Sequence, residues 1–225
     1  PLFMKEILSI NMVLNNKRNP TTCIIGGSKV STKLGIITSL IKKVDNLIIV
    51  GAMANNFIKF RGNKVGKSLI EIGSEKIIKD IYGKANINDC EIITPTDFAV
   101  SESKDGEANI KSGDSLTDNE MILDIGPQTI EKINKIIDIS KTVLWNGPAG
   151  YFENQNFAKG TISIAEKISK NTNSKSLISI VGGGDTISAI QNNTLDVNFT
   201  HLSTAGGAFL EYIEGKNLPG VEVLK

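Results

Sequence analysis

The chain has 225 residues, 40% of them hydrophobic and 22% charged, which is typical of a folded globular protein rather than a disordered or membrane protein. The formal net charge is +1 with lysines and carboxylates interspersed, so we expect no long-range field that holds nucleic acid or an anionic membrane. No run of about 18 apolar residues is present to span a bilayer, and the two cysteines lack metal-ligand spacing, which indicates buried thiols in a cytoplasmic protein.

The predicted elements alternate between helix and strand along the chain. Six runs are nearly continuous in isoleucine, valine and leucine, as in strands covered on both faces of a parallel sheet; they lie at 21–25, 46–50, 90–94, 141–145, 176–181 and 199–203. Helical patterns lie at 4–16, 31–43, 74–85, 128–140, 157–171, 186–192 and 207–215. This order predicts a three-layer α/β/α fold around a mostly parallel, Rossmann-like six-stranded sheet.

The interval 95–118 departs from this alternating order. Its sequence carries "KDG" between short segments of alternating polar and apolar residues, a pattern typical of a β-hairpin. We therefore expect a surface hairpin inserted between the sheet-forming units.

Glycine clusters recur at the carboxyl ends of five predicted strands, in "IIGGSKVSTK", "VGAMANN", "WNGPAGYFEN", "VGGGDT" and "STAGGA". Open α/β sheets form their ligand crevice at this edge, so we expect the five loops to face one cleft. A single glycine pair is equally well explained by a tight turn that needs positive φ. Five on one edge favour a ligand that approaches the backbone, with phosphate as the candidate anion for unpaired helix N–H groups.

Two familiar nucleotide motifs fail at specific positions. The stretch "RGNKVGKSL" at 61–69 ends like a Walker A loop, but Arg61 stands where that motif requires glycine. The dinucleotide fingerprint G-x-G-x-x-G also fails, because Ile187 takes the place of its third glycine. A nicotinamide-dependent dehydrogenase is therefore only weakly supported.

Two lysines and one carboxylate accompany the glycines. Lys29 and Lys33 are four residues apart, a spacing that predicts one face of a starting helix and two ammonium groups within reach of an anion. The alternative is that both are simply solvated. Asp185 follows the triple glycine and is a candidate Mg²⁺ ligand, because magnesium is commonly held by one or two carboxylates together with phosphate oxygens and water. Its alternative role is a helix N-cap.

Three further polar residues belong to the same loops. Thr186 offers a hydroxyl to the same phosphate, and Glu153 is either an acceptor for ribose hydroxyls or a surface charge. His201, the only histidine, is interpreted as structural, because phosphoryl transfer needs positioned donors and cations more than a proton shuttle.

Taken together, the loops resemble one family. The motifs "GGSKVSTKL", "LDIGPQT", "LWNGPAGYFEN", "VGGGDT", "STAGGA" and "IEGKNLPGV" follow the order found in phosphoglycerate kinases, specifically in their carboxyl-terminal, nucleotide-binding half. The resemblance implies an inter-domain helix at 1–16 and a nucleotide-binding α/β domain at 17–225. It also implies phosphoryl transfer between 1,3-bisphosphoglycerate and MgADP, which yields ATP and 3-phosphoglycerate in glycolysis.

The resemblance also implies roles for individual residues. Lys29 would contact the nucleotide phosphates, Lys33 would follow the transferring phosphoryl group, Asp185 would hold Mg²⁺, and Thr186 would bind a phosphate. The remaining nucleotide-binding positions are Gly27, Ser28, Gly51, Ala52, Asn146, Pro148, Tyr151, Glu153, Gly182, Gly183, Gly184 and Gly206. Backbone N–H groups of Gly184 and Gly207 would join Lys33 in catalysis by stabilising an anionic transition state.

The sequence departs from the family pattern in three respects. Ala205 replaces a usual glycine, and "VGAM" replaces the more common "GGGM". More importantly, the amino-terminal half that binds the phosphoglycerate is missing, and neither Arg18 nor Arg61 lies in a family substrate motif. We therefore expect a monomer that binds MgADP or MgATP but has negligible turnover alone. The alternative is a stand-alone nucleotide-binding module without catalysis.

Overall fold

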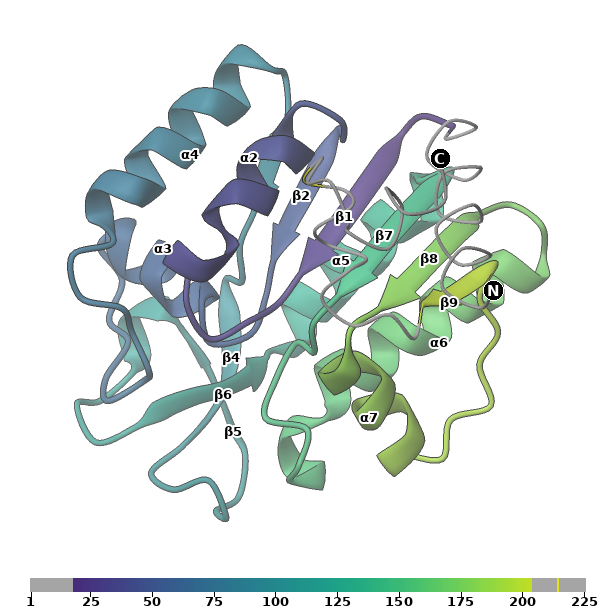
Figure 1. The fold of residues 1–225 in the computed structure, drawn as a ribbon. Helices are drawn as coiled ribbons and strands as arrows, with labels where there is room; N and C mark the ends of the chain where they lie inside the picture. The colour runs from purple at the N-terminus through teal and green to yellow at the C-terminus, as the bar shows by residue number, and fades with distance from the viewer. Residues whose placement is uncertain (1–17, 204–213, 215–225) are drawn as a thin grey trace, which may run out of the picture.

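The computed structural model describes residues 18–203 and Glu214, so the helices expected at 4–16 and 207–215 lie outside the described residues. Figure 1 shows the arrangement of the elements. Their bounds are β1 (Thr21–Ile25), η1 (Ser31–Lys33), α2 (Leu34–Ile41), β2 (Asn46–Ile49), α3 (Ala54–Phe60), α4 (Glu75–Ile87), β3 (Glu91–Ile93), β4 (Asp97–Ser101), β5 (Asn109–Ser112), η2 (Gly113–Ser115), β6 (Met121–Ile125), α5 (Pro127–Ile139), β7 (Thr142–Asn146), η3 (Gln155–Phe157), α6 (Lys159–Asn173), β8 (Ile178–Gly182), α7 (Gly184–Asn192) and β9 (His201–Ser203).

The main sheet has six strands in the order β3-β2-β1-β7-β8-β9, and every neighbouring pair is parallel. The predicted six-stranded parallel sheet is therefore confirmed. The chain builds outward from β1 to β3 on one side and from β7 to β9 on the other, so the strand order reverses between β1 and β7. Open α/β sheets bind their ligands at such a switch point, beyond the carboxyl ends of the strands.

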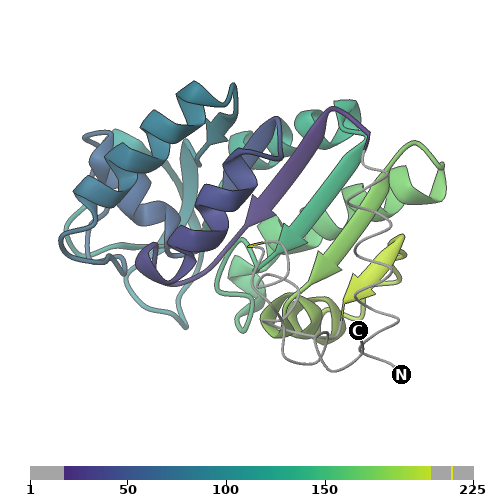
Figure 2. The same cartoon turned by 45° about the horizontal axis from the view of Figure 1, so that its top comes forward.

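Alternate residues of the strands point into two separate cores, as the pleat of a strand requires. Cys23 and Ile25 pack with α2, α3 and α4, whereas Ile24 packs with α5, α6 and α7 on the opposite face. The views in Figure 1 and Figure 2 show helices on both sides of the sheet, so the predicted three layers are confirmed. No helix in the described ranges is long and apolar enough to cross a membrane.

The interval after β3 forms a second, antiparallel sheet in the order β5-β4-β6. The predicted hairpin is confirmed as the pair β4 and β5, but the prediction was incomplete because β6 pairs with the other edge of β4. β6 was not predicted, because Asp124 interrupts its short apolar run. Helix α3 was not predicted, because its "ANNFIKF" is short and carries two asparagines of low helix propensity.

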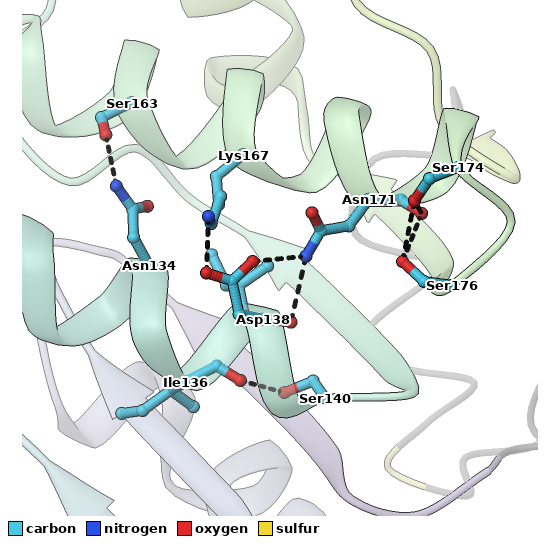
Figure 3. A network of polar contacts seen from close by, with 10 residues as sticks. Asn134, Ile136, Asp138, Ser140, Ser163, Lys167, Asn171, Ser174 and Ser176 are labelled. Carbon is cyan, nitrogen blue, oxygen red and sulfur yellow. Dashed lines mark hydrogen bonds and ion pairs between the residues drawn. The ribbon is translucent and has the colours of Figure 1, made fainter.

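A polar network joins α5 to α6 on the second helical layer (Figure 3). The Asp138 carboxylate accepts hydrogen bonds from Lys167 Nζ at 2.6 Å and Asn171 Nδ2 at 3.1 Å. One turn earlier, Asn134 Nδ2 donates to Ser163 Oγ at 3.0 Å. These contacts fix α6 against α5, and α6 begins beside the loops at the carboxyl edge of the main sheet.

Candidate nucleotide site

Two adjoining cavities lie at the switch point. One, of about 280 Å³, is bounded mainly by glycine and polar residues: Gly26, Gly27, Ser28, Thr32, Lys33, Asn146, Gly147, Pro148, Gly183, Gly184, Asp185 and Thr186. The other, of about 350 Å³, has a more apolar wall that includes Gly51, Ala52, Ala54, Ile58, Leu69, Leu123, Ile125, Ala149, Tyr151 and Glu153. Gly27, Ser28, Pro148 and Asp185 line both cavities. The structure thus brings loops 26–33, 146–153 and 182–186 to one cleft.

The loops after β1 and β7 touch backbone to backbone. Gly26 N donates to the Asn146 carbonyl oxygen at 2.7 Å. A Cβ atom at Gly26 would lie 2.5 Å from the Pro148 carbonyl oxygen, and Gly147 has a φ of 99°. Residues other than glycine rarely adopt that φ, and a side chain at Gly26 would collide with the Pro148 backbone. Part of the glycine pattern is therefore required by packing between the loops rather than by a ligand.

The turn from β8 into α7 leaves backbone open to the polar cavity. Gly183, with a φ of 100°, is the N-cap of α7. A Cβ at Gly184 would meet no atom within 4 Å, so packing does not demand glycine there. The first N–H groups of an α-helix have no partner within the helix. This turn therefore offers donors and a partial positive charge to an anion in the cavity.

Asp185 is not the N-cap of α7. The cap is Gly183, and Asp185 is the second residue of the helix, exposed and on the wall of both cavities. The capping role considered for Asp185 is therefore wrong, because the tight turn needs a positive φ one residue before the helix. The carboxylate is left facing the junction of the two cavities.

The two lysines differ in their surroundings. Lys33 is half-buried on the wall of the polar cavity, where burial lowers the pKa of its ammonium group and the Asp185 carboxylate partly offsets that effect. Lys29 is exposed and belongs to the wall of neither cavity. The single helical face expected for the pair does not form, because helical structure begins only at Ser31. Of the two, only Lys33 lines the cleft.

Thr186 and Asn146 join the β7 loop to the β8 turn. Gly147 N donates to Thr186 Oγ1 at 2.7 Å, and Asn146 Nδ2 donates to the Gly182 carbonyl oxygen at 2.9 Å. Thr186 is fully buried, but its hydroxyl accepts that bond and keeps its own proton to donate. Both residues line the polar cavity while they hold its walls together.

The larger cavity contains residues that the sequence analysis missed. Lys104, at the end of the β4–β5 hairpin, places Nζ 4.9 Å from the centroid of the Tyr151 ring, beside Glu153 on the wall. Asn154 Nδ2 donates to the Lys104 carbonyl oxygen at 2.8 Å and fastens the hairpin to the β7 loop. No local pattern marked Lys104, because its approach depends on how the second sheet folds onto the first.

Two buried polar residues also line the larger cavity. Asn55 Nδ2 donates to the Leu69 carbonyl oxygen at 3.0 Å, while no described residue donates to Asn55 Oδ1. The Asp124 carboxylate accepts from Gly160 N and from Ile125 N, each at 2.8 Å. Burial raises the pKa of Asp124 from 3.8 to about 7. Neither residue was predicted, because an isolated asparagine or aspartate carries no motif.

The described residues contain no group of three or more histidine, cysteine, aspartate or glutamate side chains suited to a metal ion. Asp185 is a single carboxylate at the cavity junction. That arrangement fits Mg²⁺ only when phosphate oxygens and water supply the remaining ligands. Gly206 and Gly207, expected to contribute backbone N–H groups, lie outside the described residues.

The fold and the cleft define a class: a Rossmann-like α/β protein with an anion-suited, glycine-lined cleft next to a more apolar one at the switch point. Within this class, residues 1–216 match the family model described as phosphoglycerate kinase. The chain therefore belongs to the phosphoglycerate kinase family.

Individual relatives agree with this assignment. Phosphoglycerate kinase from Xanthobacter autotrophicus is 44% identical over 222 residues, and the match covers 98% of this chain and 56% of that protein. The enzyme from Rhodopseudomonas palustris is 45% identical over 224 residues, with the same coverage of 98% and 56%. The structure of phosphoglycerate kinase from Coxiella burnetii matches with a TM-score of 0.92 at 39% identity, over 100% of this chain and 57% of that one. The chain thus spans about half the length of these relatives.

Proposed function

We propose that this chain is the carboxyl-terminal, nucleotide-binding half of a phosphoglycerate kinase and binds MgADP and MgATP at the switch point. The observation that carries the proposal is the pair of adjoining cavities, one apolar and one rich in glycine and polar groups, with Asp185 at their junction. A nucleoside diphosphate has the same division into an apolar base and a charged phosphate tail. Membership of the family supports this choice over other anions.

The nucleotide occupies both cavities in this proposal. The base lies in the larger cavity between Gly51, Ala52 and Tyr151, and the ribose hydroxyls bind Glu153. The phosphates lie in the polar cavity near Lys33, and Asp185 holds Mg²⁺ together with phosphate oxygens and water. Lys29 is exposed and lies outside both walls, so its proposed contact requires the side chain to swing toward the phosphates.

Phosphoryl transfer is a proposal for the complete enzyme. The transferring phosphoryl group passes through a loose, anionic transition state, which positioned cations and N–H donors stabilise. In this chain the proposed donors are the Lys33 ammonium group and the backbone N–H groups of Gly184 and Gly207. The acyl phosphate, 1,3-bisphosphoglycerate, would be held by the other half of such an enzyme, the amino-terminal one. The reaction moves its phosphoryl group to MgADP and yields ATP and 3-phosphoglycerate.

Isolated, the chain is proposed to bind nucleotide as a monomer with negligible turnover, because closure of a second half is needed to exclude water and align the reactants. A cytoplasmic location is part of the proposal, since both cysteines are free thiols.

Calorimetric titration with ADP, ATP and NAD, each with and without Mg²⁺, tests the proposal. The expected result is Mg²⁺-dependent binding of ADP and ATP and none of NAD. Binding of NAD alone would favour a dehydrogenase, and absence of nucleotide binding would refute the proposal. A coupled assay on the isolated chain adds a second test, because near-normal turnover would reveal a substrate site within this half.

A further inference from the structure

The segment between α3 and α4 contains the false Walker A stretch at 61–69, followed by Glu71, which does not belong to the proposed nucleotide contacts. Glu71 nevertheless reaches the loop that follows β1. Its Oε2 atom accepts a hydrogen bond from Ser31 N at 3.0 Å, across 40 residues of sequence. Ser31 opens η1, and Lys33 closes it. The carboxylate therefore contacts the same loop that brings Lys33 to the polar cavity.

Glu71 is held in place from its other side. Glu71 N donates to Asn56 Oδ1 at 2.8 Å, and Ser74 Oγ donates to the same oxygen at 3.2 Å. Asn56 is only 4% exposed and belongs to α3, which packs into the first core. A rigid path thus runs from the core through Asn56 and Glu71 to Ser31.

The contact is charge-assisted. Hydrogen bonds from Ser31 hold the pKa of Glu71 below its usual range, with a smaller contribution from Lys29, so the side chain is ionised at neutral pH. Bonds from a backbone N–H to a carboxylate are stronger than those between neutral groups. The loop is anchored in the first core by Val30, which is buried, but Ser28, Lys29, Ser31 and Thr32 on either side of it are exposed, so the Glu71 contact adds a second attachment.

We propose that Glu71 is a positioning residue for the phosphate-binding loop 26–33: its carboxylate bonds the Ser31 amide and holds the loop in the conformation that places Lys33 in the polar cavity. This inference rests on the proposed function. A loop already fixed before the ligand arrives loses less conformational entropy on binding. The effect should therefore be larger on the phosphates than on the base, since Lys33 lines only the polar cavity and this loop contributes only Gly27 and Ser28 to the larger one.

The experiment compares Glu71→Ala with Glu71→Gln in the full chain. Alanine removes the acceptor, whereas glutamine keeps an acceptor oxygen at similar reach and removes only the charge. Glu75→Gln is the matched control, because Glu75 is exposed in the first turn of α4 and forms no hydrogen bond or ion pair with the loop among the residues that the structure describes. MgADP is titrated calorimetrically, adenosine is measured by competition, and amide hydrogen exchange is followed over residues 28–33.

Glu71→Ala is expected to weaken MgADP binding by about tenfold, which corresponds to about 1.4 kcal/mol. Adenosine affinity should fall much less than MgADP affinity, and exchange of the Ser31 amide should accelerate. Glu71→Gln should stay within about threefold of the wild-type affinity, because a neutral hydrogen bond retains part of the contact. The control variant should match the wild type in all three measurements.

Several results would overturn the inference. Equal weakening of MgADP and adenosine would make Glu71 a purely structural residue, and unchanged MgADP affinity would make the contact irrelevant to binding. Tighter MgADP binding would show that Glu71 competes with phosphate instead of supporting the loop. If Glu71→Ala does not fold, Glu71→Asp replaces it, since the shorter side chain keeps the charge but loses reach. Failure of the wild-type chain to bind MgADP would instead refute the proposed function.

Discussion

Asp124 makes the stability of this domain depend on pH in an unusual direction. The side chain is 2% exposed, and its two oxygens accept hydrogen bonds from Gly160 N and Ile125 N. Burial is the largest influence and raises the pKa of the carboxyl from 3.8 to about 7, although both N–H groups and the more distant Lys159 act in the opposite direction. The folded state therefore favours the protonated form over most of the acidic range.

The sign and size of the effect follow from that shift. Between pH 4 and pH 7 the unfolded chain has lost this proton while the folded chain retains it. The contribution of Asp124 to the free energy of unfolding is therefore fully present below about pH 4 and is lost as pH rises through 7. A shift of about three units corresponds to roughly 4 kcal/mol in total, of which roughly 2.5 kcal/mol falls between pH 5 and pH 8.

Urea unfolding of the wild type and Asp124→Asn at pH 5, 6, 7 and 8 measures this contribution. Asparagine cannot ionise, and its NH₂ group cannot accept one of the two backbone bonds, so a constant destabilisation is expected in addition. The informative quantity is the pH dependence of the difference, because Glu71 and Asp138, whose pKa values are lowered, affect both proteins alike. The stability advantage of the wild type should shrink by roughly 2.5 kcal/mol from pH 5 to pH 8.

The exposed Asp118 provides the control, since Asp118→Asn should leave the pH dependence of stability unchanged. A difference between wild type and Asp124→Asn that is flat from pH 5 to pH 8 would refute the reasoning. It would mean that the two N–H donors balance the cost of burial and that the folded carboxyl ionises normally.

Three further changes test the site. Asp185→Asn should weaken MgADP binding by more than about tenfold in calorimetry while the urea midpoint stays nearly constant, and comparable loss of stability would contradict a metal-binding role. Lys33→Ala, in an enzyme reconstituted with an amino-terminal half, should lower kcat more than it raises KM for nucleotide, because its contact strengthens in the transition state; an effect on KM alone would argue against this. Gly26→Ala should cost about 1–3 kcal/mol or more of unfolding free energy, whereas Gly184→Ala, which faces open space, should leave urea stability unchanged. Similar stability losses for both glycines would contradict the packing argument.

Much of the main sheet could be predicted because its strands are buried on both faces. Runs such as "TTCII" and "NLIIV" are rich in apolar residues for that reason, and the structure places β1 and β2 on them. Their carboxyl ends then had to share one edge of a parallel sheet. The convergence of the glycine loops therefore followed from strand direction alone, without knowledge of any side-chain contact.

The contacts that could not be predicted depend on long-range geometry. β6 pairs with β4 across a bulge between Ala99 and Val100, and no local periodicity encodes such a partner. Lys104 reaches Tyr151 only because that second sheet folds against the β7 loop. The spacing of Lys29 and Lys33 also wrongly predicted a shared helical face, because helical structure begins only at Ser31, after Lys29.

The glycines of the cleft answer to two different physical demands. Strands β1 and β7 are neighbours at the switch point, so the loops that leave them pass each other in backbone contact. A Cβ at Gly26 or Gly147 would lie within about 3 Å of the backbone of the other loop. Gly184 is under no such demand, because a Cβ there meets nothing within 4 Å. The first demand comes from the topology of the sheet and holds with the cleft empty. The second arises only if something occupies the space beside Gly184, so within the cleft Gly184, which has no packing requirement, is the glycine that points to a ligand.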